Sequence, residues 1–400
     1  MSISGKFDKS LAAAMLAGMC TFLSVYSTQP LLPLLRQLFH ASELEVSITV
    51  SATIFATAIT APFIGMIAER RGRKKVIVPS LFLLTVPTAM AATSTSLRML
   101  ILWRFAQGIF VPGVIAVILA YVNEEWAGRG VGRAMSSYVA GTVLGGFLGR
   151  FISGMVATHW HWRATFLVLA ALNLVGATLV RAWLPLAKNF VPAEDLRQVV
   201  DDATRHLRNP RLLANFGMGA SALFALVGCF TYTNFYLAAV PFHLNSAQLG
   251  SIFFVYLLGV VVTPQAGRFL DRFGFRSTAN LYCGMMISGL LLTLVRSLPV
   301  VIVGLAIFSS GMFVAQATAS VQTGAIAGRA RSSAAGLYVT FYYFGGSMGA
   351  TLTGWFWKWR GWPGCVLLFG FVSLASLLFA RASSGHAEKL DSAEIDLVGD

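Results

Sequence analysis

A series of uninterrupted apolar stretches, each roughly 20 residues long, limits what this chain can fold into more than any other feature. The stretches at 76–94 and 300–321 are apolar around the whole circumference of a helix, whereas a helix packed on a soluble core keeps a polar stripe. About 20 helical residues cross about 30 Å of hydrocarbon. Of the 400 residues, 56% are hydrophobic and 12% are charged, where a soluble domain has about 25% charged residues. The sequence therefore predicts an all-α membrane protein.

Twelve such segments are predicted, six in each half of the chain. They cover residues 11–33, 46–68, 76–95, 98–121, 134–156, 164–186, 212–238, 247–268, 277–297, 299–321, 333–355 and 363–381. The only long polar stretch separates the halves, and its residues 193–207 have the pattern of a short amphipathic helix at the membrane surface. The predicted organisation is a six-helix bundle at 1–186, a linker at 187–211, a second six-helix bundle at 212–381 and a tail at 382–400.

The basic residues predict which side of the membrane the loops face. The chain has 30 lysines and arginines and a net charge of +14, and most of these cations lie in alternate loops. One such loop holds Arg70, Arg71, Arg73, Lys74 and Lys75. Because basic loops stay in the cytoplasm, we expect a bacterial inner-membrane protein with both termini in the cytoplasm. This topology accounts for the charge, so the lipid bilayer is the expected partner and nucleic acid is not.

The cysteines indicate neither a disulfide framework nor a metal site. Cys20, Cys229, Cys283 and Cys365 all lie in apolar segments without paired spacing. The sequence shows no metal-ligand cluster, nucleophile motif or phosphate-binding loop. We therefore expect no cofactor, no metal and no enzymatic activity. We also expect the first apolar segment to be retained, because it lacks a signal-peptidase site.

The two halves match each other when the sequence is shifted by about 200 residues. The matched pairs are Tyr138-Val139 with Tyr338-Val339, Gly145-Gly146 with Gly345-Gly346, Gly149 with Gly349, Gly154 with Gly354, and Trp162 with Trp362. A parallel duplication of this kind places a solute site between the halves, near the middle of the bilayer. Small residues at four-residue spacing also let helices pack closely. The predicted packing glycines are Gly141, Gly145, Gly146, Gly149, Gly345, Gly346 and Gly349.

The loop after the second predicted helix carries a family signature. It reads Gly65-Met66-Ile67-Ala68-Glu69-Arg70-Arg71-Gly72-Arg73-Lys74-Lys75, and a related copy runs from Gly267 to Arg276. It resembles the loop signature of the major facilitator superfamily, with Glu69 where aspartate is usual. The resemblance implies two pseudo-symmetric six-helix bundles that carry a solute by alternating access, and a gating loop between the second and third helices. The gating residues are then Gly65, Glu69, Arg70, Gly72, Arg73, Asp271 and Arg272.

Two arginines inside predicted helices lie in motifs that point to a particular branch of the superfamily. Arg104 lies in the segment Arg104-Phe105-Ala106-Gln107-Gly108, which is similar to a fourth-helix motif to which a role in proton transfer is ascribed. Arg150 ends Gly141-x-x-x-Gly145-Gly146-x-x-Gly149-Arg150, which is similar to a fifth-helix motif of the drug:proton antiporter branch, with Gly146 in place of its proline. The chain resembles the acriflavine-sensitivity (YnfM-like) and arabinose-efflux group. Alternatively, each arginine reaches the membrane interface or binds exposed carbonyls.

Acidic residues are absent from the interior of every predicted helix. All 16 fall in predicted loops, tails or helix ends, so two buried cations stand without buried anions. Such a cavity would favour an organic anion over a cationic drug. The candidate residues of the substrate cavity are Tyr26, Gln29, Arg104, Gln107, Arg150, Tyr232, Asn234, Gln316, Tyr338 and Tyr342. Ordinary helix packing is the alternative role for each of them.

The resemblance favours one function and leaves two others open. The favoured function is proton-coupled export of small amphipathic or sugar-like solutes by a monomer. One alternative is uptake or facilitated transport of a small organic anion held by Arg104 and Arg150, and the other is a membrane receptor that transports nothing. A proton would have to use Glu124 or Glu125, at the inner end of the fourth predicted helix, or act through Arg104.

Overall fold

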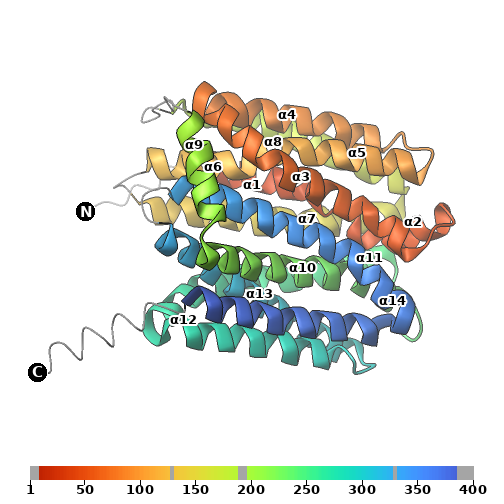
Figure 1. The fold of residues 1–400 in the computed structure, drawn as a ribbon. Coiled ribbons are helices and arrows are strands. Elements are labelled where there is room, and N and C mark those ends of the chain that lie inside the picture. The colour runs from red at the N-terminus through yellow and green to blue at the C-terminus, as the bar shows by residue number, and fades with distance from the viewer. Residues whose placement is uncertain (1–8, 127–129, 188–195, 328–330, 385–400) are drawn as a thin grey trace, which may run out of the picture.

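A computed structural model describes residues 9–126, 130–187, 196–327 and 331–384, and these residues are almost entirely helical (Figure 1). The helices are α1 (Lys9–Val25), η1 (Gln29–Leu31), α2 (Leu32–Leu38), α3 (Glu43–Arg71), α4 (Lys74–Ala91), α5 (Leu97–Phe110), α6 (Pro112–Glu125), α7 (Val131–His159), α8 (Trp162–Trp183), α9 (Leu196–Leu207), α10 (Pro210–Ala238), α11 (Ser246–Ile252), η2 (Phe253–Leu257), α12 (Leu258–Leu292), α13 (Leu298–Ile326) and α14 (Arg331–Ser384). The described part of the chain contains no strand. The predicted all-α membrane fold is confirmed.

Ten helical stretches of the described residues are long and apolar enough to cross a membrane, and two of these double back. The reversals occur at Gly274 (φ 76°) and Gly361 (φ 60°), in a backbone region that favours glycine. Gly349 and Phe369 precede and follow the second reversal, yet both lie against Gly228 of α10. Counting each arm separately therefore gives twelve spans, in agreement with the number predicted from the sequence.

Two predicted spans are interrupted, and proline is the cause in both. The first was predicted as continuous over 11–33, but α1 ends at Val25 and a tighter turn with i to i−3 hydrogen bonds leads into η1 and α2. Pro30 has no N–H to continue the α-helical ladder. The fourth, predicted over 98–121, is divided into α5 and α6 at Val111 because Pro112 opens the second helix. The first interruption leaves helix-end carbonyls inside the protein.

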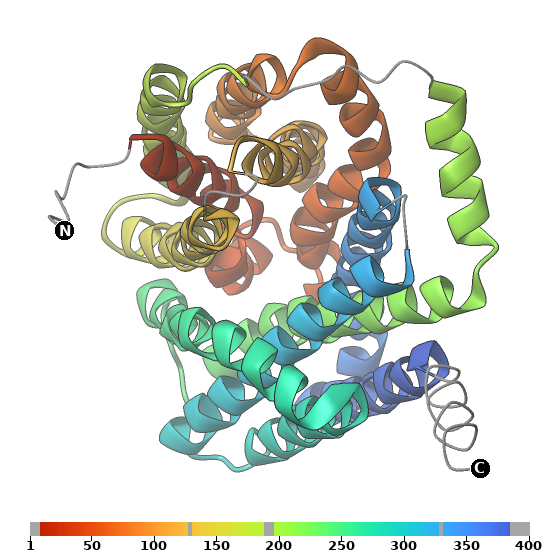
Figure 2. The same cartoon turned by 90° about the vertical axis from the view of Figure 1, so that its left-hand side faces the viewer.

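The two halves of the chain form two groups of helices that lie side by side (Figure 2). Equivalent helix pairs hold each group together. Gly145 of α7 lies against the carbonyl of Met19 on α1, and Gly345 of α14 lies against the carbonyl of Ala220 on α10. A methyl group at either glycine would overlap that oxygen. Three more predicted glycines make the same kind of backbone contact: Gly141 with Met15, Gly149 with Leu23 and Gly349 with Phe224.

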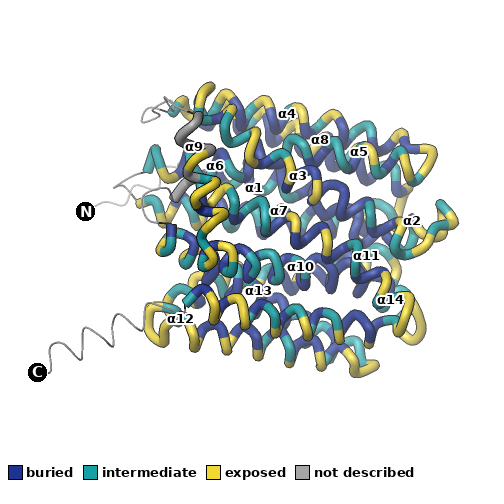
Figure 3. Tube along the Cα trace, in the orientation of Figure 1, coloured by how far each residue is buried: buried dark blue, intermediate teal, exposed yellow. Residues whose placement is uncertain are grey.

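The surface of the bundle is apolar where it would meet lipid. Large apolar side chains point outward from many helices, among them Phe63 (62% exposed), Leu102 (60%) and Phe371 (72%). Figure 3 shows buried residues on the inner sides of the helices and exposed ones on the outside. Water does not stabilise such a surface, whereas hydrocarbon does. The chain is a multi-pass membrane protein.

The polar linker contributes α9, which lies across one end of the bundle and leads from the first half to the second (Figures 1 and 2). This helix was predicted at 193–207, of which 193–195 lie outside the described residues. We call the end that carries α9 and the turn at Gly72 the basic face, and the end where α3 begins the opposite face. Capping boxes fix two helix starts on the opposite face, through Ser42 with Glu45 for α3 and Asn245 with Gln248 for α11.

Candidate solute site between the two halves

The halves touch each other between the middle of the spans and the opposite face. Four hydrogen bonds between described residues join them there: Gln29 Nε2 to Thr231 Oγ1 (3.0 Å), Tyr232 OH to Ser47 Oγ (3.4 Å), Ser347 Oγ to the Ser51 carbonyl (3.1 Å) and Ala247 N to Thr158 Oγ1 (3.0 Å). Close helix contacts reinforce them. Gly154 of α7 lies against the Ser246 carbonyl, and the rings of Phe147 and Phe254 are 4.4 Å apart. The two halves are thus closed together toward the opposite face.

Arg150 lies at the centre of this closed region and is 2% exposed. It comes from α7 in the first half, but its guanidinium carbon stands over two rings of η2 in the second half, 4.5 Å from Phe253 and 4.7 Å from Tyr256. A third ring, that of Tyr26 after the end of α1, is 4.4 Å away. We call these three rings the aromatic cage. Aromatic faces attract a cation most strongly where water is excluded.

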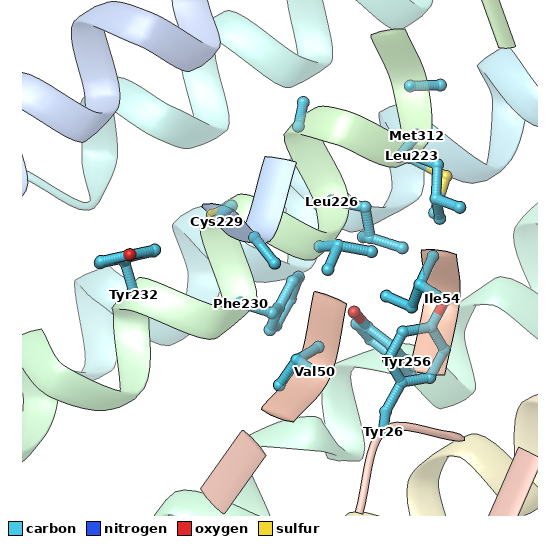
Figure 4. Packing of buried hydrophobic residues seen from close by; sticks show 14 of the residues in the cluster. Tyr26, Val50, Ile54, Leu223, Leu226, Cys229, Phe230, Tyr232, Tyr256 and Met312 are labelled. Carbon is cyan, nitrogen blue, oxygen red and sulfur yellow. The ribbon is translucent and has the colours of Figure 1, made fainter. Parts of the chain in front are cut away.

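Gln29 extends the contact between the halves. Its Oε1 accepts a hydrogen bond from Arg150 Nε (2.7 Å), and its Nε2 donates to Thr231 on α10. Gln29 is fully buried, so neither bond competes with bulk water. Tyr26 and Tyr256, from different halves, lie next to each other in Figure 4. The polar groups and rings around Arg150 therefore come from both halves of the protein.

The local sequence explains how Arg150 reaches this position. Its Nη1 donates to the carbonyl of Gly146 one turn earlier (2.5 Å), and a methyl group at Gly146 would stand 3.3 Å from that nitrogen. Gly146 therefore leaves room for the guanidinium to fold back along its own helix. On the other side, Gly250 of α11 packs against the Arg150 carbonyl, which brings the second half within reach.

Arg104 lies in a different environment and is fully buried. Its Nε donates to the Thr49 carbonyl (2.9 Å), its Nη1 to the Ser24 carbonyl (2.7 Å), and its Nη2 to the Val25 carbonyl. The carbonyls of Ser24 and Val25 belong to the last turn of α1, which lacks the usual helical donors beyond it. Nη1 also binds Gln107 Oε1, and Gln107 donates to Thr88 on α4 (3.1 Å). Arg104 and Gln107 thus join four helices of the first half.

Neither arginine has an acidic partner in the part of the chain that the structure describes. No aspartate or glutamate there belongs to the buried class. Ion pairs seen in the structure join Arg36 with Glu43 and Arg73 with Glu124, both near an end of the bundle. Arg104 is satisfied by carbonyl dipoles, whereas Arg150 is compensated mainly by rings.

These features belong to a known kind of protein. The sequence pattern that describes the Major Facilitator Superfamily matches residues 14–350, with a second match over 229–396. The chain belongs to this superfamily. It is accordingly a membrane transporter, as the loop signature predicted.

Individual superfamily proteins are similar over nearly their whole length. An uncharacterized transporter of Buchnera aphidicola subsp. Schizaphis graminum is 32% identical over 377 residues, which cover 93% of this chain and 91% of that protein. The inner membrane transport protein YnfM of Escherichia coli is 32% identical over 374 residues, with 93% and 90% covered. The solved structure of the nucleoside transporter NupG has a TM-score of 0.77 at 14% identity and covers 93% of this chain and 99% of that one.

In the superfamily loop signature, an ion pair is formed by Arg73 with Glu124, which lies outside the signature. Arg73 follows the turn at Gly72 (φ 90°), and its Nη2 lies 2.6 Å from Glu124 Oε1 at the end of α6. Glu69, the acidic residue of that signature, has one buried carboxylate oxygen without a hydrogen-bond partner among the described residues. A Cβ atom at Gly65 would have no other heavy atom within 4 Å, so no close helix contact requires glycine there. In the second copy Asp271 and Arg272 are exposed, and Arg272 lies over the Phe273 ring at 5.1 Å.

The remaining predicted cavity residues do not all gather in one place. Tyr338 and Tyr342 are buried and stack on each other with ring centroids 5.7 Å apart. Tyr232 joins the halves through Ser47, as described above. Asn234 is turned toward its own helix, where its Nδ2 donates to the Phe230 carbonyl (2.5 Å). Gln316 is half-buried on α13. Of the predicted set, Tyr26, Gln29 and Arg150 form the interhalf cluster, while Arg104 and Gln107 form a separate one.

Sequence reasoning missed three members of the interhalf cluster. Phe253 and Tyr256 lie in an apolar run that was assigned to a plain membrane span, although it forms the 3-10 helix η2. Thr231 was also overlooked, because one threonine among many apolar residues gives no signal by itself. The phenol of Tyr256 was the only usable hint, since a tyrosine inside an apolar run has a polar end that requires a partner or a site.

Proposed function

We propose that this chain exports small amphipathic or sugar-like solutes in exchange for protons, by alternating access between its two halves. Superfamily membership supports transport, and the likeness to YnfM supports placement in a bacterial inner membrane. The observation that carries the proposal is the cluster around Arg150, because both halves contribute to it. A solute that binds there contacts both halves at once. Binding can then change which face is open.

The described conformation is closed toward the opposite face, which is the outer side of the membrane if the basic face is cytoplasmic. The contacts toward the opposite face would be the closed outer gate: four hydrogen bonds, close helix contacts such as that of Gly154 with the Ser246 carbonyl, and a set of ring contacts. Opening that gate requires these contacts to break. Cysteine labelling of intact cells tests the orientation: a cysteine at Lys75 should react only after permeabilisation, and one at His159 should react without it.

Proton coupling requires a group that gains and loses a proton. Among the described residues, the carboxylates lie near the ends of the spans, and Glu124 already binds Arg73. We therefore assign coupling to Glu124 and its arginine. Purified protein in liposomes with an imposed pH gradient tests this assignment. Solute flux should follow the gradient and should lose that dependence in Glu124→Gln, whereas flux that ignores the gradient in the wild type rules out obligatory exchange.

A second candidate function is transport of a small organic anion, and a specific observation favours it. Arg150 carries a positive charge that no carboxylate of the described residues neutralises. The guanidinium of Arg104 already donates hydrogen bonds to main-chain carbonyls, so Arg150 would be the residue that binds the anion. The liposome assay separates the two candidates by the response to the pH gradient, because both movements carry charge but only the exchange also moves a proton. Uptake of a monovalent anion alone should then respond to an imposed membrane potential, and export of a neutral solute in exchange for one proton should respond both to potential and to the pH gradient.

A further inference from the structure

One donor group of Arg150 has no partner. Its Nε binds Gln29 and its Nη1 binds the Gly146 carbonyl, but Nη2 makes no hydrogen bond to any residue in the described ranges. The side chain is nevertheless almost fully buried. Because the guanidinium lies between the halves, Nη2 can donate to an acceptor on a ligand that enters there. The free Nη2 stands within the aromatic cage, between the two halves.

We propose that Arg150 is a latch released by a carboxylate: Nη2 binds the carboxylate of a small organic acid, and the guanidinium then leaves the rings of Phe253 and Tyr256. This inference rests on the proposed alternating-access function and defines the solute class for that site. In the empty protein, the cation on the two rings holds the halves together toward the opposite face. Once the carboxylate neutralises that cation, the attraction to the rings falls and the outer gate opens more readily.

The chemistry of the site selects the charge of the ligand. A carboxylate forms short, charge-assisted hydrogen bonds to guanidinium, in a place where the positive charge has no other anion. A cationic ligand would meet the same charge and be repelled, and a neutral ligand would leave the guanidinium on its rings. The three rings of the aromatic cage also provide an apolar contact for the body of the ligand. The fitting ligand is therefore an aromatic or otherwise apolar monocarboxylate.

Binding tests the ligand class on the wild-type chain itself. Benzoate, benzyl alcohol and benzylamine share one ring and differ in charge, and thermal unfolding of the purified protein reports their binding. Benzoate should raise the unfolding temperature, whereas the alcohol and the amine should not. Arg150→Lys keeps the charge but loses the planar fork, so benzoate should bind about tenfold more weakly. Equal stabilisation by benzoate and benzylamine, or unchanged benzoate binding in Arg150→Lys, overturns the proposal.

A matched control variant is available in Arg163→Lys. Arg163 also lies over an aromatic ring, that of Trp162 at 4.6 Å, and also donates to a carbonyl, that of Ser94. Both of these partners belong to the first half of the chain. Arg163→Lys should therefore bind benzoate as the wild type does. If it loses binding to the same extent as Arg150→Lys, the effect comes from general loss of arginine–ring contacts and the assignment to Arg150 fails.

Distance measurements test the latch. Spin labels on His159→Cys and Val240→Cys report the separation of the halves at the opposite face, where both residues are exposed. The four native cysteines are buried. Benzoate should increase the widely separated population severalfold, and Phe253→Leu or Tyr256→Leu should increase it without benzoate. No change in the separation on benzoate binding overturns the latch.

Failure of the latch and failure of the proposed function give different results. If liposomes containing the protein move no solute, yet benzoate still binds and separates the halves, the transport function fails while the latch stands. If Arg150→Gln transports neutral solutes as fast as the wild type and the wild type ignores benzoate, the latch fails and the transporter stands. Arg150→Gln also serves as the second variant in case Arg150→Lys does not fold.

Discussion

The two buried arginines lie in regions of opposite character. Arg104 belongs to a region inside one half, where main-chain carbonyls of two other helices accept its hydrogen bonds. Arg150 belongs to the region between the halves, where it has two hydrogen bonds, three rings and one free donor. The difference shows that burial of a cation in a membrane helix does not by itself mark a ligand site. The supply of fixed acceptors around the cation decides its role.

Two of the three main-chain carbonyls around Arg104 come from one break in a helix. Because α1 ends at Val25, the carbonyls of Ser24 and Val25 lack the i+4 N–H donors of a continuing helix, and both accept hydrogen bonds from Arg104. Arg150 lies beside the same break and beside the 3-10 helix η2, but its contacts there are with the side chains of Tyr26, Gln29, Phe253 and Tyr256 and not with main-chain carbonyls. The single exception is the Gly146 carbonyl, which Arg150 reaches by folding back. We therefore infer a structural role for Arg104 in this conformation and a ligand-binding role for Arg150.

The largest effect is expected for Arg104→Met. Three main-chain carbonyls and Gln107 would lose their charged donor in a buried region, and we expect a loss of about 3–5 kcal/mol in unfolding free energy. Thermal unfolding of the purified protein in detergent measures it, with Arg104→Lys as the milder control. If Arg104→Met unfolds at the wild-type temperature, the structural role assigned to Arg104 is wrong and the comparison with Arg150 loses its basis.

The sequence was sufficient to predict features that repeat or that depend on local chemistry. The spans follow from apolar length, and the packing glycines follow from the match between the halves: Gly145 and Gly345 indeed make the same backbone contact. The different roles of Arg104 and Arg150 could not be predicted. They depend on where α1 ends and on contacts such as Gln29 with Thr231, which are 202 positions apart. Pro30 was visible in the sequence, but its consequence for Arg104 required the fold.

A second prediction uses two neighbouring glycines that belong to the two regions. Gly145→Ala places a methyl group on the Met19 carbonyl within the first half, and we expect a loss of about 1–3 kcal/mol in stability. Gly146→Ala meets only the Arg150 guanidinium, so stability should change little while the cage contacts shift. Thermal unfolding of both variants provides the comparison. Equal destabilisation would mean that the two glycines serve the same packing contact.

Arg150→Met is expected to have a smaller effect on stability than Arg104→Met, about 1–2 kcal/mol. The change removes cation–ring attraction, but it also removes a buried charge that no carboxylate in the described residues compensates. The outer contacts should loosen at the same time, so a cysteine at Thr158 should react faster with a water-soluble reagent than it does in the wild type. A loss as large as that of Arg104→Met would place Arg150 among the structural residues.

The smallest effect is expected at the rim of the first half, for Arg73→Gln. The ion pair with Glu124 is bidentate, but its side chains are 11% and 27% exposed, so water and salt screen part of the attraction. We expect a loss of about 0.2–1 kcal/mol, which diminishes further at high ionic strength. Thermal unfolding at low and high salt measures it, and Arg36→Gln, in the more exposed pair with Glu43, should change stability even less. The gradient from Arg104 to Arg73 and Arg36 would then follow access of water to the cation. A large, salt-independent loss in Arg73→Gln would show instead that this pair, like the carbonyls around Arg104, holds the first half together.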